Sequence, residues 1–301
     1  MENTSKNFVL ELGALASLYA SLSALIMVLF GIINLTFPDA AEGYWATQSA
    51  AEGVRFGIAM LVVFFPTYLA LTRIVNQTRR KEQGVYLTLT RWLIYLSLFV
   101  GGTILLGDLV AVLWSFLNGE ITTRFILKAV ALLVVITAAV KYYLLDMRAY
   151  WTSHEQQSLM FGGVTILVVL VSIAFGYLSI DPPSEVRERR IDQQQITDLQ
   201  DMQWRIEDHY RVNGILPESI APLYISTTRP EAPEDRAMYQ YTVTGATTYE
   251  LCATFAYAST RADMSYARPL YENPELAMNS NWEHEMGEAC FERTAPVESR
   301  E

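Results

Sequence analysis

The chain has 301 residues, of which 51% are apolar, and its formal net charge is −10 at pH 7. The charge is uneven: residues 1–180 carry 11 Lys and Arg against 10 Asp and Glu, whereas residues 181–301 carry 11 Arg against 22 Asp and Glu. So acidic a region argues against nucleic acid as a partner, because phosphates are bound by clusters of Lys and Arg. We expect two regions in different environments, the second suited to a basic partner or only to solvation.

Five segments of the first region are long and apolar enough to cross a bilayer, which takes about 20 residues. Each is apolar on nearly all sides, unlike the one-sided helices of a globular core. Pro66 lies inside the second segment and predicts a kink, and Asp181-Pro182-Pro183 ends the fifth. The expected spans are 12–37, 54–74, 92–117, 125–145 and 159–180. Residues 1–180 are therefore predicted to form a membrane α-helical bundle of about five transmembrane helices, with the lipid bilayer as its partner.

The charged loops predict the orientation of this bundle. Segment 73–91 holds five Lys or Arg residues and segment 141–157 holds two, whereas segment 38–53 holds none. Loops rich in Lys and Arg stay in the cytoplasm. We therefore expect a bacterial inner (plasma) membrane protein with a cytoplasmic N terminus, and five crossings then place residues 181–301 in the periplasm.

The only two cysteines, Cys252 and Cys290, both lie in this expected periplasmic region. That compartment permits disulfides. A bridge would close a loop of about 39 residues, which is worth about 4 kcal/mol on the chain-entropy model. We expect the bridge, and two buried free thiols are the alternative.

Three charged residues fall within or at the ends of the predicted spans. Asp108 lies inside the third span, Lys128 lies near the outer end of the fourth, and Arg55 lies at the outer end of the second. A carboxylate inside a bilayer requires a partner, a proton or water. Asp108 lies about 13 Å and Lys128 about 6–9 Å inward from their shared loop, at 1.5 Å per residue. We expect a charge pair that fixes helix packing, and the alternative is a proton or ion site.

The C-terminal region predicts a small α+β domain. Apolar residues recur every three or four positions after Pro183, which indicates a helix of about 29 residues that ends at Asn213-Gly214. Runs 239–243 and 249–255 alternate and predict a β-hairpin, and "WEHEMGEACFERT" predicts a last strand. The expected stripe of the helix comprises Ile191, Gln195, Leu199, Met202, Ile206 and Tyr210. The long helix is predicted to pack on the antiparallel sheet.

The segment "DLQDMQWRIEDHYRVNGILPESIAPL", followed by "YQYTVTGATTYELCATF", resembles the soluble part of type II secretion pseudopilins. The shared order is a long helix, an Asn-Gly turn with a following Leu-Pro, a short helix and a tyrosine-rich hairpin. The resemblance implies a pilin-like domain. The preceding span begins "SLMFGGVTILVVL", without the glutamate that pilins carry at the fifth position of this helix, and it follows four other spans. We therefore do not expect this protein to enter a filament.

The stretches "LLGDLVAVLWSFLNGE" and "RFILKAV", together with the span around Pro66, carry a second resemblance. Most of residues 8–150 resemble a family of uncharacterised bacterial multi-span membrane proteins known as a domain of unknown function. This resemblance implies the helical bundle and no activity.

The sequence lacks a nucleophile elbow, a Gly-rich phosphate loop, an HExxH motif and a CxxC motif. The three histidines, His154, His209 and His284, lie outside the predicted spans, which argues against a transmembrane bis-His haem. We therefore expect no catalytic residues, no metal and no cofactor.

The expected function is that of a non-enzymatic accessory or assembly protein, for example as a subunit of a larger membrane complex. Its periplasmic domain would present a sheet edge and the helix that carries Trp204, Asp208 and Arg211 to a protein partner. The alternative is a small transporter or ion-coupled sensor that uses Asp108 and Lys128.

Overall fold

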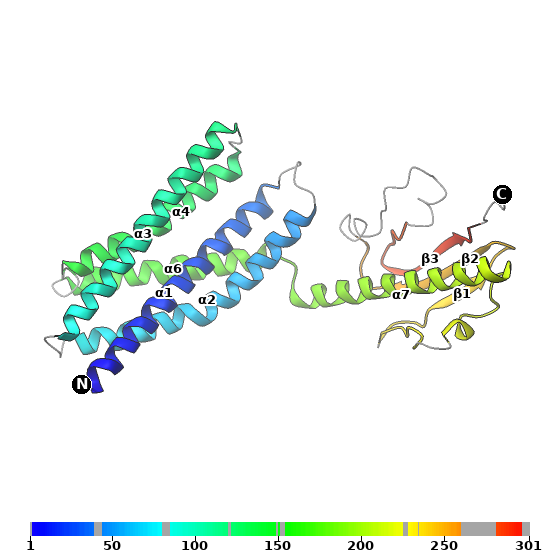
Figure 1. Ribbon diagram of the computed structural model, residues 1–301, viewed down its shortest axis with the longest axis horizontal. Coiled ribbons are helices and arrows are strands. Elements are labelled where there is room, and N and C mark those ends of the chain that lie inside the picture. The colour runs from blue at the N-terminus through cyan, green and yellow to red at the C-terminus, as the bar shows by residue number, and fades with distance from the viewer. Residues whose placement is uncertain are drawn as a thin grey trace. The chain divides into compact units, whose positions relative to one another are not determined.

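The computed structural model of the chain forms two compact units, Met1–Ile180 and Asp181–Glu301 (Figure 1). The residues that the structure describes are 2–38, 44–79, 85–119, 122–148, 150, 154–224, 228–233, 235–259 and 281–296.

The first unit is helical. Among the described residues, five helices are long and apolar enough to cross a membrane, which confirms the expected number of apolar helices. Pro66 lies inside the second of them. The helices of this unit are α1 (Glu2–Thr36), α2 (Tyr44–Arg79), α3 (Val85–Leu117), α4 (Thr123–Met147) and α6 (Glu155–Leu178).

Helices α1 and α2 lie side by side (Figure 1), and glycines let them approach closely. A Cβ on Gly31 of α1 would collide with a methyl carbon of Val54, and one on Gly57 of α2 would lie 2.7 Å from a methyl carbon of Val28. Gly176 of α6 packs against the same two valines, with a Cβ distance of 3.2 Å to each. Small residues at helix contacts are typical of helices that associate within lipid, where close packing replaces the hydrophobic effect.

Large apolar side chains cover the outer faces of these helices. Phe99 is 72% exposed, and Phe56, Trp114 and Leu167 are also exposed. A water-soluble monomer rarely exposes so much contiguous apolar surface. This surface is consistent with a membrane protein.

The second unit consists of one long helix and a three-stranded antiparallel sheet in the order β1-β2-β3 (Figure 1). Helix α7 begins at Pro183 and ends at Asn213, where Gly214 adopts the left-handed conformation (φ 73°). The Gly214 N–H donates to Tyr210 O at 2.7 Å. The expected stop therefore occurs at the expected residues, because glycine takes this conformation without steric cost. The other elements are η1 (Ala221–Tyr224), β1 (Gln240–Val243), β2 (Thr248–Phe255) and β3 (Gly287–Thr294).

The core of the second unit lies between α7 and one face of the sheet. Leu199 and Ile206 of α7 pack with Leu251 and Phe255 of β2, and all four are buried. Each such side chain contributes about 1.5–3 kcal/mol when fully buried. The stripe differs from the expected one in detail, since Ile191 and Tyr210 are only partly buried while Asp192 and Ile196 are buried.

Candidate functional site

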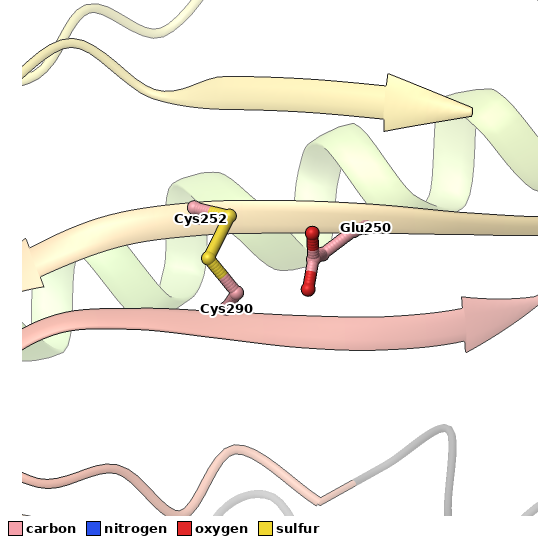
Figure 2. Close-up of side chains that lie close together, drawn as sticks. All are labelled: Glu250, Cys252 and Cys290. Atoms are coloured by element: carbon pink, nitrogen blue, oxygen red, sulfur yellow. A yellow bond between two sulfur atoms is a disulfide. The ribbon is translucent and has the colours of Figure 1, made fainter. Parts of the chain in front are cut away.

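The disulfide lies on the face of the sheet that points away from α7 (Figure 2). Cys252 of β2 and Cys290 of β3 stand opposite each other in the register, with their sulfur atoms 2.11 Å apart. The Glu250 carboxylate lies beside them, and the ligand atoms of the three residues are within 4.8 Å of one another. Soft metal ions bind cysteine as thiolate. Because the bridge consumes both thiols, this cluster is a crosslink between two strands rather than a metal centre.

The structure shows the surroundings of two of the three charged residues that were expected in the membrane bundle, Lys128 and Arg55. The ammonium of Lys128 on α4 lies 5.8 Å from the centre of the Phe30 ring on α1, a cation–π distance. Arg55 on α2 is half-buried. The backbone of Asp108 belongs to α3, and its side chain lies outside the described residues. The pairing of Asp108 with either cation therefore remains a prediction.

A crevice of about 70 Å³ lies between α1, α3 and α4. The Tyr19 hydroxyl donates to Ser97 O at 3.4 Å, and Ser23 and Tyr143 add two further polar groups to the lining. A volume of this size holds about two water molecules at roughly 30 Å³ each. The crevice is too small for an organic ligand.

Asp192 joins α7 to the end of β2. Its carboxylate is 5% exposed and accepts hydrogen bonds from Ala256 N at 3.0 and 3.1 Å and from Tyr257 N at 3.0 Å. The Arg236 guanidinium lies 3.3 Å from the same carboxylate and 2.6 Å from Glu188. A buried carboxylate is tolerated when N–H donors and an opposite charge surround it. Asp192 therefore serves the fold and is not free to act on a ligand.

Two further aspartates of α7 hold tyrosines. The Tyr224 hydroxyl donates to Asp201 and the Tyr239 hydroxyl donates to Asp198, each at 2.7 Å. Burial, followed by the neighbouring carboxylate, raises the pKa of both tyrosines. Both hydroxyls therefore remain protonated at neutral pH, and both bonds fix loops of the chain against the helix.

A second polar cluster lies under the C-terminal half of α7. Arg293 of β3 is 3% exposed, donates to Gln203 at 3.1 Å and to Asn281 O at 2.6 Å, and stacks on Trp282 at 4.1 Å. Burial lowers the pKa of Arg293 to about 10, so it is still charged at neutral pH. Burial also raises the pKa of Glu207, an effect opposed by its hydrogen bond from Gln203 and by nearby Arg211 and Arg293. The cluster holds β3 to the helix.

The face of α7 opposite its core carries the expected interaction residues. Trp204 is 59% exposed and Val212, two turns further on, is 76% exposed. Asp208 lies between them and pairs with Arg211 at 3.3 Å. We call these four residues the outer α7 face. Trp204 and Val212 are therefore large apolar side chains exposed on a charged helix face, and aromatic side chains are enriched at protein interfaces.

A groove of about 200 Å³ lies beside β1 and is lined by both apolar and charged residues. Met202 of α7 forms part of it and is buried, while Met238 is 70% exposed. Tyr239 and Tyr241 also line it. The Tyr241 hydroxyl donates to Pro217 O at 2.9 Å. Both tyrosine hydroxyls are thus bonded to groups of the same domain. We call this hollow the β1 groove.

Three exposed charged side chains, Glu218, Glu231 and Arg229, also line the β1 groove. Among the described residues, none of the three takes part in an ion pair. The groove thus combines two aromatic side chains with carboxylates that are not engaged elsewhere in the described part of the chain.

Comparison with known proteins places one part of the chain in a family. Residues 7–143 match the family described as Domain of unknown function (DUF5671). No curated protein and no solved structure matches the chain. The DUF5671 domain extends from α1 into α4 and leaves α6 and the second unit outside the match.

The three charged residues that were expected in the spans lie in the part of the chain that matches DUF5671. Arg55, Asp108 and Lys128 all fall within it, as do all residues that line the crevice between α1, α3 and α4. The outer α7 face and the β1 groove lie outside it. A function of the second unit therefore cannot be read from the family match.

Sequence reasoning missed the β1 groove. Its residues come from four separate stretches, near Met202, Glu218, Arg229 and Tyr239. No local pattern joins them, because only the packing of loops against α7 brings them together. The tyrosine-rich hairpin was the one available signal, and it indicated a core face rather than a groove.

Proposed function

We propose that the chain is a non-enzymatic accessory or assembly protein of a bacterial inner membrane. The helical unit anchors it, and the second unit lies in the periplasm as a pilin-like binding domain. The Lys and Arg content of the loops supports this orientation. A disulfide in the second unit is also expected in an oxidising compartment.

The observation that carries the proposal is the outer α7 face. Three aspartates of α7, Asp192, Asp198 and Asp201, are engaged in bonds that hold the fold. Trp204 and Val212 instead expose apolar surface to solvent. Tryptophan is enriched among residues that dominate protein interfaces. The partner is therefore expected to be a protein that covers Trp204.

Site-specific photocrosslinking in native membranes tests the proposal. A benzoylphenylalanine in place of Trp204 is expected to capture one defined partner, which mass spectrometry identifies. The matched control places the same group at Thr242, which is exposed on β1 and, by register with Glu250, faces away from α7. The substitution Trp204→Ala should lower the affinity for the same partner by about 30-fold or more, because an interface tryptophan contributes about 2 kcal/mol or more to binding.

The proposal fails if position 204 captures nothing that position 242 does not. It also fails if the protein extracted in mild detergent runs alone in native mass spectrometry, whatever its behaviour in the crosslinking experiment.

An alternative function is a small transporter or ion-coupled sensor that uses Asp108 and Lys128. The half-buried position of Lys128, with its ammonium near Phe30, is the observation that favours it. Ionisable groups inside a bilayer often mark ion or proton paths. This alternative predicts that Asp108→Asn abolishes ion flux in proteoliposomes while the protein keeps its thermal stability. A structural charge pair predicts the reverse, with lower stability as the main effect.

A further inference from the structure

The shape of the β1 groove limits what can occupy it. A volume of about 200 Å³ is below the roughly 300–1,000 Å³ of pockets that enclose whole organic ligands. It has space for a single side chain that enters from solvent. The groove is also held in place without an occupant, because Tyr239 is bonded to Asp198 and Tyr241 to Pro217 O. Little ordering is then needed when an occupant binds.

The chemistry of the groove favours a positive charge. Two tyrosines line it, and the face of a tyrosine ring attracts ammonium and guanidinium groups. Glu218 and Glu231 add two carboxylates, whereas Arg229 adds one positive charge, so the lining is negative. The surrounding unit has 22 Asp and Glu against 11 Arg, which attracts basic partners and repels acidic ones.

We propose that the β1 groove binds a basic side chain, arginine in particular, of a partner polypeptide. The guanidinium stacks on the tyrosine rings and pairs with Glu218 and Glu231, and its alkyl stem lies against Met202 and Met238. Arginine fits better than lysine because its planar group both stacks and forms paired hydrogen bonds to carboxylates. The inference rests on the proposed function, since such a side chain arrives on a bound protein, but it concerns a different surface from the outer α7 face.

Methionine methyl groups report directly on the groove. We would label the full chain with ¹³C-methyl methionine in detergent micelles and titrate it with N-acetyl-arginine amide. The resonances of Met202 and Met238 should shift and saturate. Met286, which is 71% exposed and lies outside the groove, should not respond and serves as the control. N-acetyl-norleucine amide tests whether the positive charge is required.

Variants with opposite expected signs make the test specific. Glu218→Gln and Glu231→Gln should each weaken binding of the arginine probe by up to about fivefold, as expected for exposed ion pairs. Arg229→Gln should strengthen it, because it removes the positive charge that repels the probe. Glu283→Gln, an exposed carboxylate that does not line the groove, should have no effect.

Two results would overturn the proposal. Silent Met202 and Met238 resonances would show that the groove does not bind the probe, and equal shifts with the norleucine probe would show that charge is not recognised. Photocrosslinking at Trp204 separates this failure from that of the proposed function. If position 204 captures a partner but the Met202 and Met238 resonances do not shift, the accessory role stands and the arginine site is refuted. If the resonances shift but position 204 captures no partner, the arginine site stands and the proposed function is refuted.

Discussion

The buried carboxylate of Asp192 allows a quantitative test of how α7 is held to the sheet. Asp192→Ala removes the acceptor for the N–H groups of Ala256 and Tyr257 and leaves Arg236 with Glu188 alone. Each hydrogen bond to a charged group contributes about 1.5–3 kcal/mol, and removal of one partner of a buried pair costs about 3–5 kcal/mol. We therefore expect a loss of about 3–5 kcal/mol. Asp192→Asn keeps one acceptor oxygen and should lose less.

Hydrogen–deuterium exchange of the full chain measures this loss at the site itself. The amides of β2 and of Ala256 and Tyr257 should exchange about 100-fold faster or more, at 1.4 kcal/mol per factor of ten. Asp208→Ala is the matched control, since this aspartate lies on the outer face of the same helix. Its half-exposed ion pair with Arg211 should contribute less than about 1 kcal/mol. Equal effects of the Asp192 and Asp208 variants would refute the reasoning.

Three further predictions concern the rest of the fold. Gly57→Leu should lower thermal stability in detergent by about 1–3 kcal/mol because a Cβ there lies 2.7 Å from Val28, whereas Gly102→Ala, with open space around it, should not. Burial raises the pKa of Glu207, so the protonated carboxyl group is favoured in the folded state. The free energy of unfolding measured with denaturant should therefore fall as the pH rises from the ordinary pKa of 4.5 through the raised pKa. Glu207→Gln should remove this part of the pH dependence. Replacement of Cys252 and Cys290 by Ala should destabilise the second unit by up to about 4 kcal/mol on the chain-entropy model, while the intact mass of the native protein falls about 2 Da below that of its reduced form.

Features set by local pattern could be predicted from the sequence. Long apolar runs define helices whatever surrounds them, and the Asn213-Gly214 pair ends α7 as expected. The alternation also predicted the β-hairpin, and in the structure Tyr249, Leu251 and Phe255 of β2 lie in the core. In each case the cause lies within a few residues of the effect.

Features set by distant partners could not be predicted in this way. An aspartate on a water-facing helix normally indicates a solvated position, and the N–H groups that make burial of Asp192 tolerable lie 64 and 65 residues away. The kink expected from Pro66 and the charge pair expected for Asp108 depend likewise on packing within the bundle. Only the packed structure shows which polar groups are engaged.

This distinction bears on how the acidic surface of the second unit is understood. Three of its aspartates, Asp192, Asp198 and Asp201, bond to groups of their own domain, so part of the formal negative charge stabilises the fold. Within the part of the chain that the structure describes, Glu218 and Glu231 have no such structural bond, and both line the β1 groove together with Tyr239 and Tyr241. The net charge alone could not separate a solvating surface from a binding surface. The proposed binding of a basic side chain in the β1 groove would give two of these carboxylates a role beyond solvation. The Glu218 variant should weaken binding of the arginine probe and the Arg229 variant should strengthen it, so the two variants together test this role directly.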